Sequence, residues 1–209
     1  TQGGSDIRFW VGDFGSGKSF MLRTIESLAV QKNFVVSTVD LTPTRRFYAS
    51  DGKAKALYNE IVNNMVVQTS QDGNAINTII EEWINRIIMD VSERDKIPVE
   101  KLLLAENGKI IEKEILNVTS SFRSVGLSYE LGQAISKYYQ GVAEDNRVLR
   151  LKSLRWIRGD IGTKTESKRE LGIQSIINDD NWYDALKNLA ELFSSIGYSG
   201  FVINFDEAV

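Results

Sequence analysis

The residues with the clearest chemical meaning lie near the start of the chain, in the run Gly12-Asp13-Phe14-Gly15-Ser16-Gly17-Lys18-Ser19. This run has the spacing G-x-x-x-x-G-K-[ST], which is typical of loops that hold the phosphates of a nucleoside triphosphate. Gly15 and Gly17 let the backbone N–H groups approach a polyanion closely. We expect Lys18 to reach the β- and γ-phosphates and Ser19 to place its hydroxyl on Mg²⁺. The predicted nucleotide-binding residues are Gly12, Asp13, Phe14, Gly15, Ser16, Gly17, Lys18, Ser19 and Phe20.

The elements around this run favour the motif over a chance match in a surface loop. Residues 7–11 (IRFWV) predict a buried strand, residues after Lys18 show apolar positions at helical spacing, and residues 34–41 (FVVSTVDL) predict a second strand. Strand, glycine loop, helix and strand form a βαβ unit, so we expect a parallel sheet. The dinucleotide-binding spacing G-x-G-x-x-G fails, because Phe20 stands at its third position.

A second group of candidate residues closes the sequence. Residues 200–205 (GFVINF) predict a buried strand that leads into Asp206 and Glu207. This pattern is weak alone, but beside a phosphate loop it predicts that Asp206 holds Mg²⁺ through water. Glu207 would then orient and deprotonate the attacking water, so Glu207 and Lys18 are the candidate catalytic residues. Asn204 could be a hydrogen-bonded structural residue or a neighbour of the site, and the structural interpretation is preferred. Because Glu207 follows Asp206 and no guanine-reading N-K-x-D motif occurs, ATP is favoured over GTP.

Composition narrows the chemistry further. The 209 residues suit one domain, and 25 basic against 28 acidic residues argue neither for nor against nucleic acid. The chain has no cysteine and no histidine, which excludes thiolate chemistry and imidazole bases and leaves oxygen-ligated metals such as Mg²⁺. No apolar run is long enough to span a bilayer, so a cytoplasmic protein without a membrane partner is the default expectation.

The middle of the chain predicts helices. Apolar residues repeat by three and four over residues 76–91 and 182–196, and the latter segment has Asn181 or Asp180 as its N-cap and Gly197 just past its end. We therefore expect a single P-loop ATPase domain whose core is residues 5–52 and 197–209, with a large, mostly helical insertion at residues 53–196.

A basic segment within this insertion leaves several readings open. Between Asp145 and Glu170 there are eight basic and four acidic residues, and Arg147, Arg150 and Arg158 would share one helix face. They could contact DNA phosphates, a partner or a neighbouring subunit's nucleotide, although a solvated face with internal ion pairs is the preferred interpretation. Arg45 and Arg46 have the same alternatives.

Taken together, the motifs resemble those of the ATP-binding proteins of the BREX phage-defence system, the BrxC/BrxD-like P-loop ATPases. The resemblance covers nearly the whole chain and rests on residues 9–20 (FWVGDFGSGKSF), 39–46 (VDLTPTRR), 154–172 (LRWIRGDIGTKTESKRELG) and 179–183 (DDNWY). It implies an AAA+-like ATPase with ATP and Mg²⁺ as cofactors, acting in antiviral defence beside methyltransferase and phosphatase partners and forming a homo-oligomer at full length.

That resemblance also predicts an incomplete core. AAA+-like sheets run in the order 5-1-4-3-2, and by this reading the chain holds strands 1, 2 and 3 and resembles a fragment that ends after the Asp206 strand. Strands 1 and 3 would then lack the neighbour between them. We expect an ATPase that is weak or inactive as this chain alone. The alternative is a nucleotide-regulated interaction or DNA-binding module with little or no hydrolysis, and a kinase is a distant third.

Overall fold

The computed structural model describes residues 4–48, 51–103, 107–122 and 126–207 as a mixed α/β chain. The three strands in these ranges are β1 (Val35–Asp40), β2 (Met65–Val66) and β3 (Phe201–Asp206). The helices are α1 (Lys18–Gln31), α2 (Lys53–Asn63), α3 (Ile76–Asp95), α4 (Val99–Leu102), α5 (Gly108–Ser120), α6 (Ser128–Ala143), α7 (Arg147–Ile157), α8 (Lys164–Leu171) and α9 (Trp182–Ile196). Both predicted strands at residues 34–41 and 200–205 and both predicted helices at residues 76–91 and 182–196 are confirmed.

The sheet is small and mixed, with the order β2-β1-β3. β1 pairs with β3 in parallel, from Val35 opposite Phe201 to Asp40 opposite Asp206. β2 pairs with β1 in the antiparallel direction. The expectation of a parallel sheet is therefore confirmed for β1 and β3 and wrong for β2. Only Asn64 separates α2 from β2. The chain therefore enters β2 while still running in the direction of α2, which is opposite to the direction of β1.

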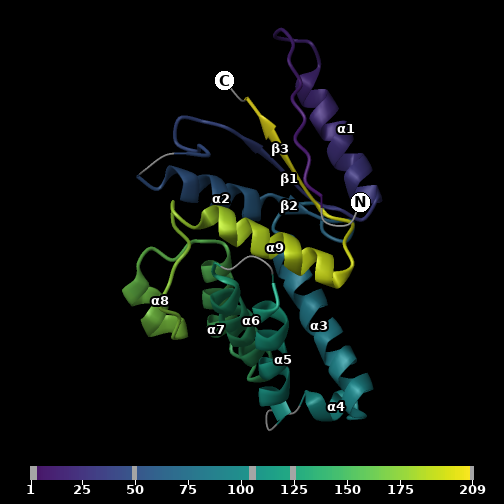
Figure 1. Ribbon diagram of the computed structural model, residues 1–209, viewed down its shortest axis with the longest axis vertical. Coiled ribbons are helices and arrows are strands. Elements are labelled where there is room, and N and C mark those ends of the chain that lie inside the picture. The colour runs from purple at the N-terminus through teal and green to yellow at the C-terminus, as the bar shows by residue number, and fades with distance from the viewer. Residues whose placement is uncertain (1–3, 49–50, 104–106, 123–125, 208–209) are drawn as a thin grey trace.

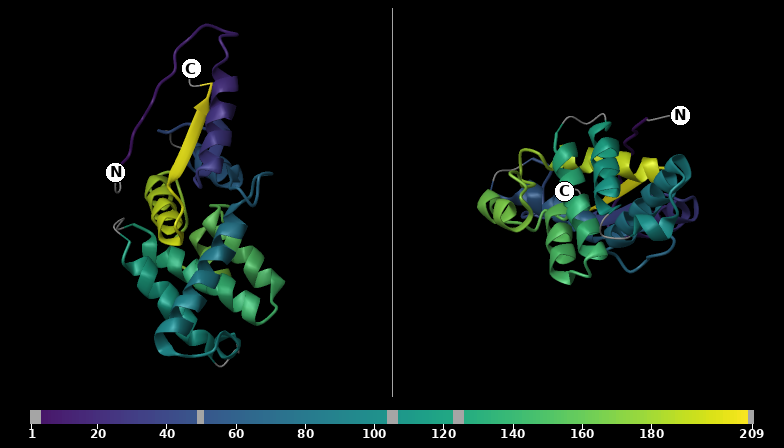
Figure 2. Two further views of the ribbon diagram at one scale, coloured as in Figure 1. Left: turned by 90° about the vertical axis from the view of Figure 1, so that its right-hand side faces the viewer. Right: turned by 90° about the horizontal axis from the view of Figure 1, so that it is seen from below.

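The predicted strand at residues 7–11 does not form. These residues have no strand assignment, and their apolar side chains are exposed, with Phe9 at 87% and Val11 at 99% of full exposure. A strand needs a neighbour to accept and donate its backbone hydrogen bonds. In the described residues no strand pairs with the segment, nor with the edge of β3 that faces away from β1. Figure 2 shows the segment running clear of the sheet toward the phosphate loop.

Side chains of β1 and β3 alternate between two faces of the sheet. On one face, Ser37 donates a hydrogen bond to the Ile61 carbonyl of α2 at 2.7 Å. On the other face, Thr38 donates to the Glu26 carboxylate of α1. The sheet therefore lies between α1 on one side and α2 on the other (Figure 1).

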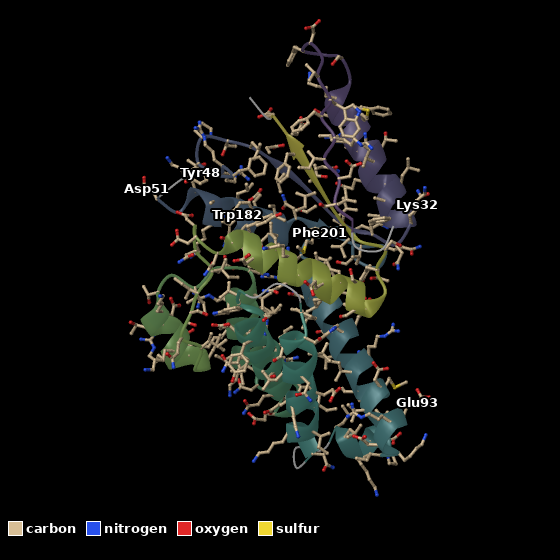
Figure 3. The ribbon with its side chains drawn as sticks, in the orientation of Figure 1. Lys32, Tyr48, Asp51, Glu93, Trp182 and Phe201 are labelled. Carbon is tan, nitrogen blue, oxygen red and sulfur yellow. The ribbon has the colours of Figure 1, made fainter. Side chains whose placement is uncertain are left out.

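The face toward α2 joins the main apolar core. Val35 and Val39 belong to a buried cluster that continues through α2, α3, α5, α6, α7 and α9. Phe201, labelled in Figure 3, stands at the start of β3. Its ring meets that of Phe193 on α9 edge-on, with the ring centroids 5.2 Å apart. The α1 face has a much smaller apolar cluster, formed by Val30, Val36 and Val66. Helices α2, α3, α5, α6, α7 and α9 thus share one core with one side of the sheet, whereas α1 packs on the other side through a small apolar cluster and hydrogen bonds.

Among the described residues, no helix is long and apolar enough to cross a membrane.

Candidate nucleotide-binding site

The glycine loop has the backbone conformation that its sequence predicts. Gly15 and Gly17 have φ angles of 81° and 87°, in the left-handed region that side chains disfavour, and nothing lies within 4 Å of where a Cβ would stand on either residue. The Ser16 N–H closes a turn onto the Asp13 carbonyl at 3.2 Å. The loop is therefore a tight turn with an open inner surface, which suits a ligand that approaches the backbone closely.

The N-terminus of α1 faces this loop without a side-chain cap. Gly17 is the N-cap residue and supplies no side-chain hydrogen bond to the first turn. The first four N–H groups of an α-helix have no partner inside the helix, and together with the helix dipole they attract anions. A helix of 14 residues that starts at Lys18 therefore presents free donors and a partial positive charge beside the loop.

The partly exposed Lys18 side chain folds back onto the loop. Its Nζ donates to the carbonyl oxygens of Gly12 at 2.7 Å and of Asp13 at 2.8 Å. A lysine ammonium has three donors, so one remains for a further acceptor. The charge is thus held at the mouth of the loop, where a phosphate would meet it.

The two motifs meet in space. The Ser19 hydroxyl donates to Asp206 Oδ2 at 2.6 Å, although the two residues are 187 positions apart in sequence. Because the single hydroxyl proton is used on Asp206, the oxygen lone pairs of Ser19 stay free for a cation. Mg²⁺ in nucleotide sites takes one or two protein oxygens and otherwise water and phosphate oxygens, so these two residues fit its preferences. No group of three or more acidic side chains that could hold a metal ion is found in the described part of the chain.

Glu207 follows directly after β3. Its backbone N–H donates to Asp206 Oδ1 at 2.9 Å, and its φ of 54° turns the chain out of the strand direction. Both carboxylate oxygens of Asp206 therefore have a donor, one from α1 and one from the chain that follows. The Glu207 side chain is exposed.

A polar network behind Asp206 joins α1 to both strands. Asn204, only 6% exposed, donates to Thr38 Oγ1 at 3.1 Å and to the Leu22 carbonyl at 3.4 Å, and Thr38 donates to Glu26. The interpretation of Asn204 as a hydrogen-bonded structural residue is confirmed. No sequence motif marks Glu26 or Thr38, because their partners are determined by strand register.

Within the described part of the chain, the other candidate residues make no contact that points to a role in nucleotide binding. Phe14 and Phe20 are exposed on the loop and on α1. Arg45 forms an ion pair with Glu60 at 2.6 Å, and Arg46 is exposed. Phe47 packs edge-on against Phe205, which lies on the face opposite Asp206.

The basic segment is not one free surface. Arg150 lies 3.7 Å from Asp145, and Arg158 donates to Asn77 Oδ1 on α3 at 3.1 Å. Arg155 lies between Glu166 and Glu170 of α8, with N–O distances of 3.0 and 3.7 Å. Ion pairs within the protein therefore take up much of the positive charge predicted from the sequence.

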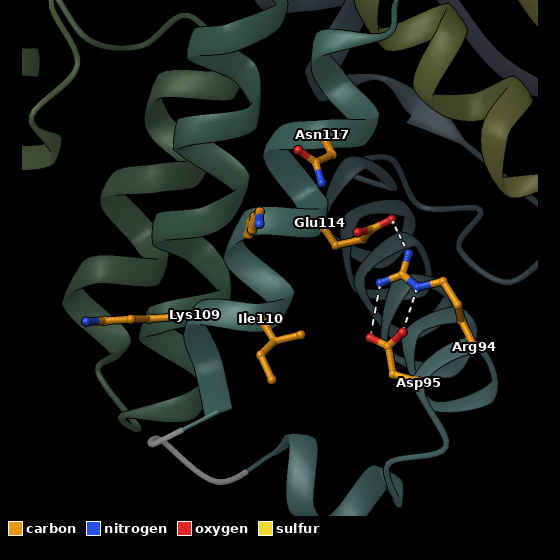
Figure 4. Close-up of a pocket in the computed structure, with 7 residues that line it drawn as sticks. Arg94, Asp95, Lys109, Ile110, Glu114 and Asn117 are labelled. Atoms are coloured by element: carbon orange, nitrogen blue, oxygen red, sulfur yellow. Dashed lines mark hydrogen bonds and ion pairs between the residues drawn. The ribbon is translucent and has the colours of Figure 1, made fainter.

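An open groove of about 640 Å³ lies far from the phosphate loop, between α3 and α5. Arg94, Asp95 and Glu114 line one side of this groove, and Arg94 donates hydrogen bonds to both carboxylates at 2.9 Å (Figure 4). The Arg94 guanidinium also holds the pKa of Asp95 below its usual range. Because Arg94 is already paired with two carboxylates, the groove offers less to a ligand than the glycine loop does.

Comparison with known proteins gives one match. The family of BREX system ATP-binding proteins BrxC/D matches residues 1–209, the whole chain. No curated protein matches the chain, and no solved structure does.

Proposed function

The chain belongs to the BREX system ATP-binding protein BrxC/D family, and from that premise we propose that it is a magnesium-dependent P-loop ATPase unit with Gly12–Ser19 as its phosphate loop. The contact between Ser19 and Asp206 carries the proposal, because it joins the two halves of such a site across 187 positions of sequence. The family itself accounts for ATP binding and for a place in the BREX system. An AAA+-like sheet order and hydrolysis belong to the proposal.

Each residue would have a distinct part. The α1 N-terminus and the loop N–H groups would hold the phosphate oxygens, and Lys18 would move its charge from the Gly12 and Asp13 carbonyls toward the β- and γ-phosphates. Mg²⁺, when bound, would offset negative charge on the phosphates. Ser19 would offer its oxygen to that ion while its proton stays on Asp206. Glu207, next in the chain, would accept a proton from the attacking water.

Isothermal titration with ATP tests the binding part. The substitution Lys18→Ala removes a charged donor worth about 1.5–3 kcal/mol, so the ATP dissociation constant should rise by roughly 10- to 150-fold. Lys32→Ala, at the opposite end of the same helix, is the matched control and should leave it unchanged. Equal ATP affinity in the wild type and in Lys18→Ala would refute the proposal.

Glu207→Gln in the full-length protein tests the chemical part. A general base contributes on the order of 10²- to 10⁴-fold, so turnover should fall by at least about 10²-fold while ATP binding persists. If turnover is absent in the wild type, the nucleotide-regulated interaction module becomes the better description. Turnover that is present but unchanged in Glu207→Gln would show that Glu207 is not the general base. The DNA-binding alternative has less support because Arg150 and Arg155 lie beside acidic side chains of the same chain.

A further inference from the structure

Asp40 and Asp206 end two neighbouring strands at the same edge of the sheet. β1 and β3 are parallel and in register, with Thr38 opposite Asn204 and Asp40 opposite Asp206. Neighbouring strands lie about 4.8 Å apart, and residues in register point to the same face. The hydrogen bond between the Asn204 and Thr38 side chains shows this shared direction one step earlier along both strands.

The face on which Asp40 lies follows from its neighbours. Asn204 and Asp206 of β3 both contact α1, through the Leu22 carbonyl and the Ser19 hydroxyl. On β1, Ser37 contacts α2 and Thr38 contacts α1, so the alternation puts Asp40 on the α1 face with Asp206. Asp40 is exposed at the end of that strand.

The charge at this edge is unbalanced. In the described part of the chain, the Asp40 carboxylate has no hydrogen bond or ion pair, and its nearest cross-strand neighbour is another aspartate. Like charges directly opposite one another on a sheet are destabilising. A divalent cation beside Ser19 and Asp206 would relieve the repulsion, and among the described residues no basic side chain forms an ion pair with either aspartate.

We propose that Asp40 is a positioning residue of the divalent-cation site, holding a water molecule of the cation that Ser19 and Asp206 bind. The inference rests on the proposed function and adds a residue to it that lies outside both sequence motifs. A water-mediated role suits Mg²⁺, which releases its water reluctantly and keeps several molecules in nucleotide sites. It also suits the position of Asp40, on the strand next to the one that carries Asp206 and its hydrogen bond to Ser19.

The test measures Mn²⁺ binding by electron paramagnetic resonance in the presence of ADP, without any need for turnover. The variants are Asp40→Asn, Asp206→Asn and Ser19→Ala, with Asp90→Asn as the control, because Asp90 is an exposed aspartate on α3, far from this edge. Circular dichroism melting checks that each variant is folded. We expect Asp40→Asn to raise the Mn²⁺ dissociation constant by about 10-fold, Asp206→Asn and Ser19→Ala to raise it further, and Asp90→Asn to leave it unchanged.

Two outcomes would overturn the inference. One is wild-type Mn²⁺ affinity in Asp40→Asn while Asp206→Asn binds Mn²⁺ weakly. The other is tighter metal-free ADP binding in Asp40→Asn with no change for Mn²⁺, since Asp40 would then only repel phosphates. Failure of the proposed function is a separate result, in which neither Ser19→Ala nor Asp206→Asn changes Mn²⁺ or ADP binding.

Discussion

The two faces of the β1–β3 pair differ in character toward the carboxyl ends of the strands, although the same two strands form both. Val35 and Val39 face α2 within the main apolar core, whereas Thr38 faces α1 with a hydroxyl group. On β3, Phe201 packs against Phe193, whereas Asn204 and Asp206 bond to α1. The alternation of the strands thus places residues of the main apolar core on one face and residues that contact α1 beside the candidate site on the other. Substitutions on the two faces should therefore have different consequences.

The largest effect should come from the apolar face. Phe193 is fully buried on α9, and Phe193→Ala should lower the free energy of unfolding by about 3–5 kcal/mol, because it removes a buried ring and leaves a cavity. Urea unfolding followed by circular dichroism measures this. ATP affinity per folded molecule should not change. A decrease of less than about 1 kcal/mol in the free energy of unfolding would mean that Phe193 is packed less tightly against the sheet than its contacts indicate.

The α1 face should respond differently to Asn204→Leu. The substitution keeps the branched shape of the side chain but removes its two hydrogen bonds, so the free energy of unfolding should fall by about 1–3 kcal/mol. Since these bonds hold α1 against β3 beside the Ser19–Asp206 contact, the ATP affinity should fall as well. Paired urea unfolding and ATP titration measure both quantities. Unchanged ATP affinity would break the proposed separation between the faces.

Ser37→Ala gives the matched polar change on the other face. Ser37 is buried and donates to the Ile61 carbonyl, so its loss should cost about 0.5–1.5 kcal/mol of unfolding free energy. The ATP dissociation constant should stay within about twofold of the wild type, because no α1 contact is touched. A larger shift in ATP affinity would show that the two faces are coupled through β1.

The smallest effect is expected far from both faces, at Glu166 on α8. The Gly162 N–H and then Arg155 lower the pKa of this carboxyl below its usual value of 4.5. A depressed carboxyl pKa contributes stability that is present above the usual value and is lost as the pH falls through the folded-state value. Glu166→Gln should therefore lower the melting temperature slightly at pH 7 and by less below about pH 4. An equal difference at both pH values would contradict this linkage.

The sequence predicted most of the elements that have their own local pattern. The β-branched run before Asp40, the apolar strand before Asp206 and the periodic helices at α3 and α9 were all read from composition and spacing. The candidate site is predicted from the Gly12–Ser19 motif. That motif also leads to the expectation that Ser19 and Asp206 lie close together, as they do in the structure.

The rest could not be read locally because it depends on partners. Residues 7–11 have the pattern of a strand, yet no strand of the described chain pairs with them. β2 has only two residues, which is too short for an alternating apolar pattern. It forms because the short connection through Asn64 places it beside β1. The pairing of Asp40 with Asp206 depends on strand register, which no local pattern predicts. Both residues are, however, acidic residues at the end of an apolar strand, and this shared pattern could have marked Asp40 as a candidate.

The 187 positions between Ser19 and Asp206 also bear on how the protein is made. Synthesis proceeds at about 5–20 residues per second, so roughly 10–40 s pass between the two residues leaving the ribosome's catalytic centre. During that time β1 can pair with β2, which follows it closely in the chain, but its other edge has no native neighbour. The nascent chain therefore carries an unpaired apolar strand edge until β3 arrives, and a chaperone that shields this edge should raise the yield of folded protein.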